Sequence, residues 1–201
     1  MSGVKNKKTM NQILEKSRII GIHTFRKYDT TTPEAHALEK EIEQLIADRH
    51  LWNPIAYRAK YTELYNKMKQ YMTEEKVIKN LITTRGRSVL AQRLANDTTY
   101  TGIINYGALG SSSTAVTNAD TQLNTEVFRK VVASTSTTNN IAFIDFFYSK
   151  TDTNGTYEEF GTFIDGTGTV NTGRIFTHAL TGGWTKSSSE SMTVACQYTF
   201  T

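Results

Sequence analysis

Apolar residues recur at helical spacing in the first part of the chain. Thr32 precedes Pro33 and Glu34, an order typical of a helix start, because threonine caps a first turn and proline fits within it. The stripe that follows has spacings of three or four residues: Ala35, Leu38, Ile42 and Leu45. This pattern predicts a helix with one narrow apolar side.

A second stripe begins after Trp52-Asn53-Pro54, where proline ends one helix and suits the start of another. Two stripes joined by a short corner predict an antiparallel helical pair, like a hairpin or coiled coil. Because each stripe is narrow, we expect a partner helix from another copy or another protein. The residues expected to bind it form the anchor seam: Leu38, Ile42, Leu45, Tyr57, Tyr61, Leu64, Met68 and Tyr71.

Two further helices are expected on either side of this pair. Thr9 and Gln12 have the spacing of a capping box, which predicts a helix over about 9–20. Another is expected over about 74–95, with Gly86 as a break, on the apolar positions Val77, Ile78, Leu81, Val89, Leu90 and Leu94.

The apolar pattern changes to a period of two in the second half. Residues 192–200 alternate without fault, with Met192, Val194, Cys196, Tyr198 and Phe200 on one face, which predicts a half-buried strand. Turn-forming sequences such as Asn154-Gly155, 165–168 and Gly182-Gly183 separate comparable segments at about 103–109, 126–132, 141–148, 157–164 and 174–181. The segment 141–148 is apolar on both faces except at Asp145, so we expect it to be the central strand.

These patterns predict an α+β protein. An N-terminal helical segment, hairpin or coiled-coil-like, is followed by a C-terminal antiparallel β-sandwich. We divide the chain into a helical anchoring segment (1–79), a connecting helix (80–95) and a sandwich domain (96–201).

The order of short motifs in residues 80–201 resembles that of a family of virion structural proteins from tailed bacteriophages. The matching stretches are NLITTRGRSVLAQRL at 80–94, INYGALG at 104–110, DTQLNTEVFRK at 120–130, EEFGTFIDG at 158–166 and GRIFTHAL at 173–180, followed by Lys186 and the closing strand. The resemblance implies a β-sandwich of a neck, collar, baseplate or tail-fibre part, which serves in assembly or attachment. The motifs it rests on carry no catalytic signature, and the first 79 residues lie outside it.

The net charge of +4 hides a division along the chain. Residues 1–95 hold 18 basic and 10 acidic side chains, whereas residues 96–201 hold 5 and 9. Basic helices could bind phosphates, but the interleaved tyrosines Tyr57, Tyr61 and Tyr71 fall on the apolar seam, so we interpret them as core or partner contacts and not as platforms for stacking bases. We therefore favour docking of the basic segment on an acidic protein ring over binding to nucleic acid.

Candidate catalytic residues are few, and we do not expect an enzyme. Glu158 and Glu159 are adjacent in a strand and point to opposite faces, so we interpret them as solvent-facing or rim carboxylates. His178 lies in a strand and is interpreted as a packed or interface histidine, and Cys196 as a small core residue. No spacing matches a metal or phosphate site, so no cofactor is expected.

The hypothesis from sequence is a structural component of a tailed-phage virion, made in the host cytoplasm. Its partners would be portal, neck, tail or fibre proteins, with several symmetric copies and no membrane insertion, since no apolar run is long enough to span a bilayer. Two alternatives remain open. One is a head-fibre or glycan-binding receptor module that uses Trp184 as a surface recognition residue, and the other is a nucleic-acid-binding protein that uses the basic half.

Overall fold

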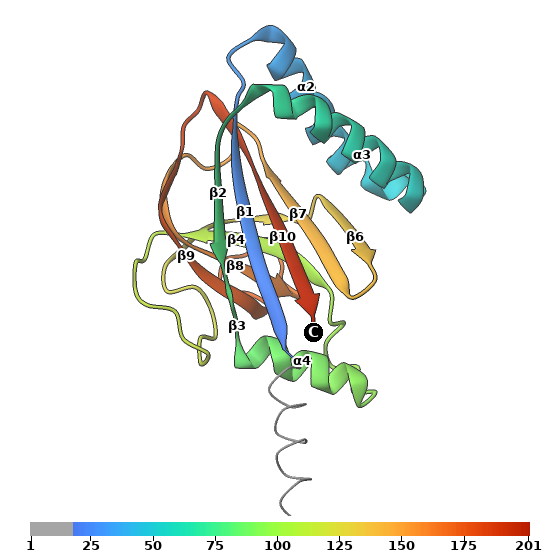
Figure 1. Cartoon of the computed structure of the whole chain (residues 1–201), viewed down its shortest axis with the longest axis vertical. Coiled ribbons are helices and arrows are strands. Elements are labelled where there is room, and N and C mark those ends of the chain that lie inside the picture. Colours follow the sequence, from blue (N-terminus) through green and yellow to red (C-terminus); the bar gives the residue numbers. More distant parts are fainter. Residues whose placement is uncertain (1–17) are drawn as a thin grey trace, which may run out of the picture.

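The computed structural model describes residues 18–201 and shows a mixed α+β fold whose second half is rich in strands (Figure 1). Its elements are β1 (Ile19–Asp29), α2 (Pro33–Ala47), η1 (Arg49–Leu51), α3 (Pro54–Met68), η2 (Lys69–Tyr71), β2 (Met72–Lys79), β3 (Leu81–Ile82), α4 (Thr84–Leu94), β4 (Ile104–Gly110), β5 (Glu126–Val131), β6 (Ser134–Thr138), β7 (Ile141–Tyr148), β8 (Gly155–Ile164), β9 (Arg174–Lys186) and β10 (Glu190–Phe200).

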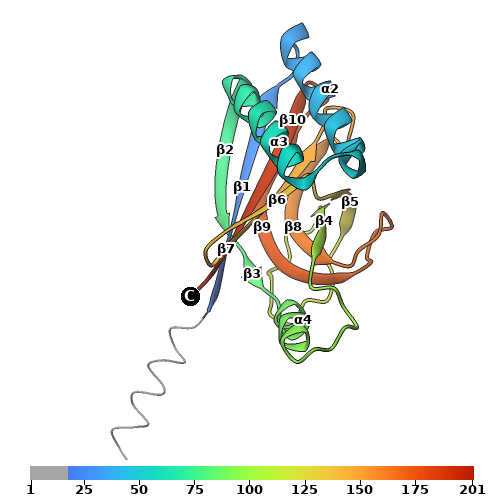
Figure 2. The same cartoon turned by 90° about the vertical axis from the view of Figure 1, so that its right-hand side faces the viewer.

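The strands form two antiparallel five-stranded sheets. Sheet A has the order β2-β1-β10-β7-β6, and sheet B has the order β3-β9-β8-β4-β5. The main core contains side chains from both sheets, such as Phe25 and Val194 of sheet A and Phe160 and Phe176 of sheet B. Figure 2 shows helices α2 and α3 on the outer side of sheet A and α4 at one end of the molecule.

The predicted helical pair and the predicted closing strand are confirmed. Thr32 caps α2 by accepting a hydrogen bond from the Ala35 amide, and Asn53 caps α3 in the same manner, with Pro54 in the first turn. In β10 the alternating residues Met192, Val194, Cys196 and Tyr198 are buried in the core. Local capping and alternation were therefore sufficient to place these three elements.

Two residue ranges expected to be helical contain strands. Ile19 and Ile20 begin β1, whereas the rest of the predicted helix over 9–20 lies outside the described residues. Most of the first third of the predicted helix over 74–95 is strand β2, followed by the short β3, so that α4 begins only at Thr84. The cause is tertiary, because β1 pairs with β10 from Ile19↔Phe200 to Asp29↔Glu190 and β2 extends the same sheet.

This pairing joins the first segment of the chain to its last strand. The first 79 residues contribute two α-helices, two short 3-10 helices and two strands to the described structure, and both strands belong to sheet A with β7 and β10. The division into segments at residues 79/80 and 95/96 stays a prediction. The longest strand pair of sheet A, β1 with β10, joins the first of these segments to the last.

Glycines and one strand position also differ from expectation. Gly86 does not break α4: a Cβ there would lie 2.7 Å from the Phe176 ring, so its small size permits close packing on β9. Gly182 and Gly183 lie within β9, with φ of 66° and 78°, and do not form a turn between strands. The central strand of sheet A is β10, with the predicted β7 beside it.

Candidate interaction surface

The anchor seam is buried within the chain itself. Its members Leu38, Ile42, Leu45, Tyr57, Tyr61, Leu64 and Met68 are buried, and Tyr71 packs beside them. They cover Tyr28 and Phe147 on the outer face of sheet A, together with Ala133 in the link that leads into β6. Sheet A therefore takes the place of the expected partner helix, and the interpretation of the seam as a surface free to bind a partner is corrected.

Polar contacts fix the helical pair to the sheet at its corner. The Tyr57 hydroxyl donates to the Ala133 carbonyl over 2.5 Å, and Arg49 donates to the Val132 carbonyl over 3.1 Å. Both acceptors lie in the link between β5 and β6. The corner between α2 and α3 is thus held in one position relative to sheet A.

Apolar side chains project from this corner into solvent. Leu51 is 71% exposed, Trp52 40% and Ile55 79%, and we call these three residues the hairpin tip. The tip forms because the cap at Asn53 and Pro54 turns the chain sharply, so that residues off the seam face outward. Exposed apolar groups gathered within five residues are typical of an interaction site.

An apolar groove opens beside the tip. Its volume is about 390 Å³, and it lies between the β6 side of sheet A and the end of sheet B that α4 covers. We call it the inter-sheet groove. Arg58 and Thr135 line both this groove and a smaller hollow under Trp52, so the tip and the groove are continuous.

Trp184 does not lie on the surface. It is 2% exposed in the main core, its indole N–H donates to the Met192 sulfur, and the Lys27 ammonium lies 4.9 Å from its ring centroid. The alternative in which Trp184 is a surface recognition residue is therefore wrong, because the indole is packed in the core although Gly182 and Gly183 beside it have positive φ.

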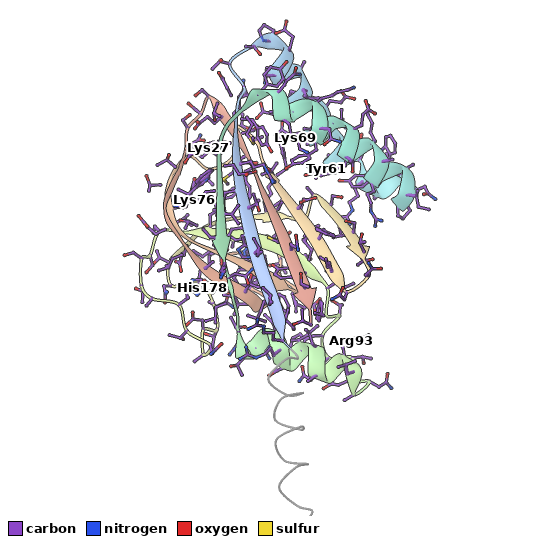
Figure 3. All side chains as sticks on the ribbon, in the orientation of Figure 1. Lys27, Tyr61, Lys69, Lys76, Arg93 and His178 are labelled. Carbon is purple, nitrogen blue, oxygen red and sulfur yellow. The ribbon has the colours of Figure 1, made fainter. Side chains whose placement is uncertain are left out.

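The outer face of sheet B is covered by the loop between β4 and β5. Leu123 of this loop packs with Phe163 and Ile175 of the sheet. Polar contacts of the loop include a cluster around His178, which lies in sheet B, away from the helical pair (Figure 3).

His178 is held between two carboxylates. Its Nδ1 lies 2.6 Å from Asp120 of the loop, and its Nε2 lies 2.8 Å from Glu159 of β8. Glu159 also accepts the backbone amides of Asn124 and Thr125, so it binds the loop directly. We call these groups the loop clamp. Glu159 is buried, which corrects its expected position at a solvent-facing rim.

The charges of the clamp stabilise one another. Burial opposes the charge of His178, but the hydrogen bonds to Glu159 and Asp120 raise the pKa of His178 above its ordinary value. Burial likewise opposes the charge of Glu159, and the bonds from His178, Thr125 and Asn124 lower its pKa. Sequence alternation placed Glu159 and His178 in strands, but only the path of the loop reveals that this face is covered.

The clamp binds the loop and does not have the arrangement of a nucleophilic site. A histidine that activates a nucleophile keeps one ring nitrogen for that group, whereas both nitrogens of His178 face carboxylates. Within residues 18–201 no three His, Cys, Asp or Glu side chains converge in a manner that could hold a metal ion. No helix in that range is both long and apolar enough to cross a membrane.

The cations of α3 differ in their pairing. Lys60 contacts Glu41 and Glu63, and Lys67 contacts Glu63, so part of the basic excess is neutralised locally.

No protein family, curated protein or solved structure matches this chain in comparisons with known proteins.

Proposed function

We propose that this protein is a structural component of a tailed-phage virion, present in several symmetric copies. In this proposal the two facing sheets are a β-sandwich body, and the helical pair is the attachment element. Attachment occurs through the hairpin tip, since the seam is occupied by sheet A. The body presents its free surfaces to the next component or to a fibre.

The observation that carries the proposal is the exposed hairpin tip. Leu51 and Ile55 expose most of their surface on a corner that Tyr57 and Arg49 hold in place. Burying such side chains against a partner is favourable by about 25 cal/mol per Å² of apolar surface. A rigid apolar tip loses little conformational freedom on binding, and several copies multiply weak contacts. The motif order of residues 80–201 adds the phage family as the context.

The test is a double substitution, Leu51→Asp with Ile55→Asp, assayed for incorporation into purified phage particles. We expect the variant to fold, because both side chains are exposed, and to be lost from the particle. The matched control is Ala37→Asp with Ala59→Asp, which adds the same charge at exposed positions of α2 and α3. Incorporation of the tip variant at the level of the control would overturn the proposal.

A further inference from the structure

The inter-sheet groove has a floor of core side chains and walls that reach the surface. Ile144, Phe176 and Tyr198 are buried members of the main core and form part of its lining. At the rim, Ile103 is 63% exposed and Phe200 42%. The groove therefore leads from solvent to the interior between the two sheets, and its apolar walls favour an apolar occupant over water.

A single cation stands at the mouth of this groove. Arg58 of α3 is exposed, and no hydrogen bond or ion pair of its guanidinium occurs within residues 18–201. Lys60 and Lys67 on the same helix both have acidic partners, so Arg58 differs from its neighbours. Thr135 and Thr137 line the same groove and bring polar side chains to it.

The volume of the groove limits what it can hold. At about 390 Å³ it falls in the range of sites for small molecules. Two turns of an α-helix, at a diameter of about 10 Å, fill roughly 800 Å³, so a helix does not enter it. A single alkyl chain is slender enough to enter the groove, with its polar end at the mouth.

We propose that the inter-sheet groove binds a single-chain anionic amphiphile from solution, with the tail along the floor and the carboxylate on Arg58. A guanidinium matches a carboxylate in charge and in its paired donors. The tail gains from burial on the side chains of the core, and the rim residues Ile103 and Phe200 cover it. The inference does not depend on the virion role.

The test measures binding of dodecanoate to the full chain by titration calorimetry, below the concentration at which it forms micelles. Dodecanol and dodecyltrimethylammonium serve as matched probes with a neutral and a positive head. We expect saturable binding of dodecanoate, about tenfold weaker binding of dodecanol, and weaker binding still of the cation, because the neutral head loses the hydrogen bond between two charged groups and the positive head is repelled by Arg58.

Variants separate the head from the tail. Arg58→Gln weakens dodecanoate about tenfold and leaves dodecanol unchanged, whereas Ile103→Asp, at an exposed rim position, weakens both. Lys67→Gln, an exposed cation of the same helix, changes neither. Thermal unfolding checks that each variant is folded.

Three results would overturn the inference: no saturable binding of dodecanoate, equal binding of all three probes, or no effect of Arg58→Gln. Binding to vesicles of anionic phospholipid without binding of free dodecanoate would also overturn it, since that result assigns the charge to a membrane surface. Particle incorporation is a separate readout, so failure here leaves the proposed function standing.

Discussion

The two sheets have outer faces that are covered by different means. Sheet A is covered by α2 and α3, whose apolar seam buries seven side chains against it. Sheet B is covered by a loop that has Leu123 as its main apolar contact and is also held by polar contacts, the most deeply buried of which form the clamp around His178. One cover is held by burial of apolar surface and the other by buried charge.

This difference determines what each cover responds to. Apolar burial scales with area and is insensitive to pH near neutrality. Buried charges contribute only while every partner is present and correctly protonated. The helical cover should therefore fail gradually as side chains are shortened, whereas the loop cover should fail when a single charge is removed.

The largest expected effect is at the clamp. Glu159→Gln preserves shape but removes the more deeply buried of the two carboxylates that face His178, and breaking a buried pair costs about 3–5 kcal/mol. We expect the free energy of unfolding, measured in urea, to fall by about that amount. Faster hydrogen exchange is expected at the amides of Asn124 and Thr125, which Glu159 holds.

The pH dependence of this loss identifies its cause. Because the pKa of His178 is raised in the folded state, its charge stabilises the fold below about pH 6.5. This stabilisation disappears as the pH rises through the pKa of the folded state. The lowered pKa of Glu159 contributes stability above about pH 4.3 that disappears as pH falls. The difference between wild type and Glu159→Gln should thus be greatest between about pH 5 and 6.5. A difference that is constant from pH 4 to 9 would contradict the ionic account.

The next effect is in the helical cover. Leu64 of α3 is fully buried in the seam, so Leu64→Ala should lower the free energy of unfolding by about 3 kcal/mol through lost burial and the cavity that remains. Asn66→Ala, an exposed change on the same helix, is the control and should cost less than about 0.5 kcal/mol. The loss should be equal at pH 5 and pH 8. A loss below 1 kcal/mol would show that the seam is not held by apolar burial.

The sequence predicted the elements that local signals determine and missed those that depend on distant residues. Elements set by local signals were found, such as α2 and α3 from Thr32, Asn53 and the stripe spacing. Strands β1 and β2 were missed because their pairing is with residues far away in sequence, as Phe25↔Val194 illustrates. Local pattern does not contain that information.

The site shows a comparable limit. The seam residues were identified correctly as one surface, but their partner was not, because an amphipathic stripe does not say whether it covers a sheet or another helix. Leu51 and Ile55 could have been found as apolar positions off the seam beside Asn53-Pro54. The clamp could not, because Asp120, Glu159 and His178 meet only through the path of a loop.

The smallest expected effect sharpens the contrast, because a partly buried carboxylate with a raised pKa lies on sheet A. Asp145 of β7 lies on the outer face of sheet A, and burial raises its pKa to about 6, with Arg26 opposing this shift. An acid whose pKa is higher when folded destabilises the fold above that pH, and the fold gains stability as pH falls through it.

Because Asp145 is only partly buried, we expect Asp145→Asn to raise the free energy of unfolding by about 1 kcal/mol at pH 7.5 and by nothing at pH 4. Urea unfolding at the two pH values measures this. Acidification from pH 7.5 to about pH 5 would then favour both the cover of sheet A and the clamp of sheet B, and the clamp would weaken only below about pH 4.3. A loss of stability in Asp145→Asn at pH 7.5 would mean that the attraction of Arg26 outweighs burial.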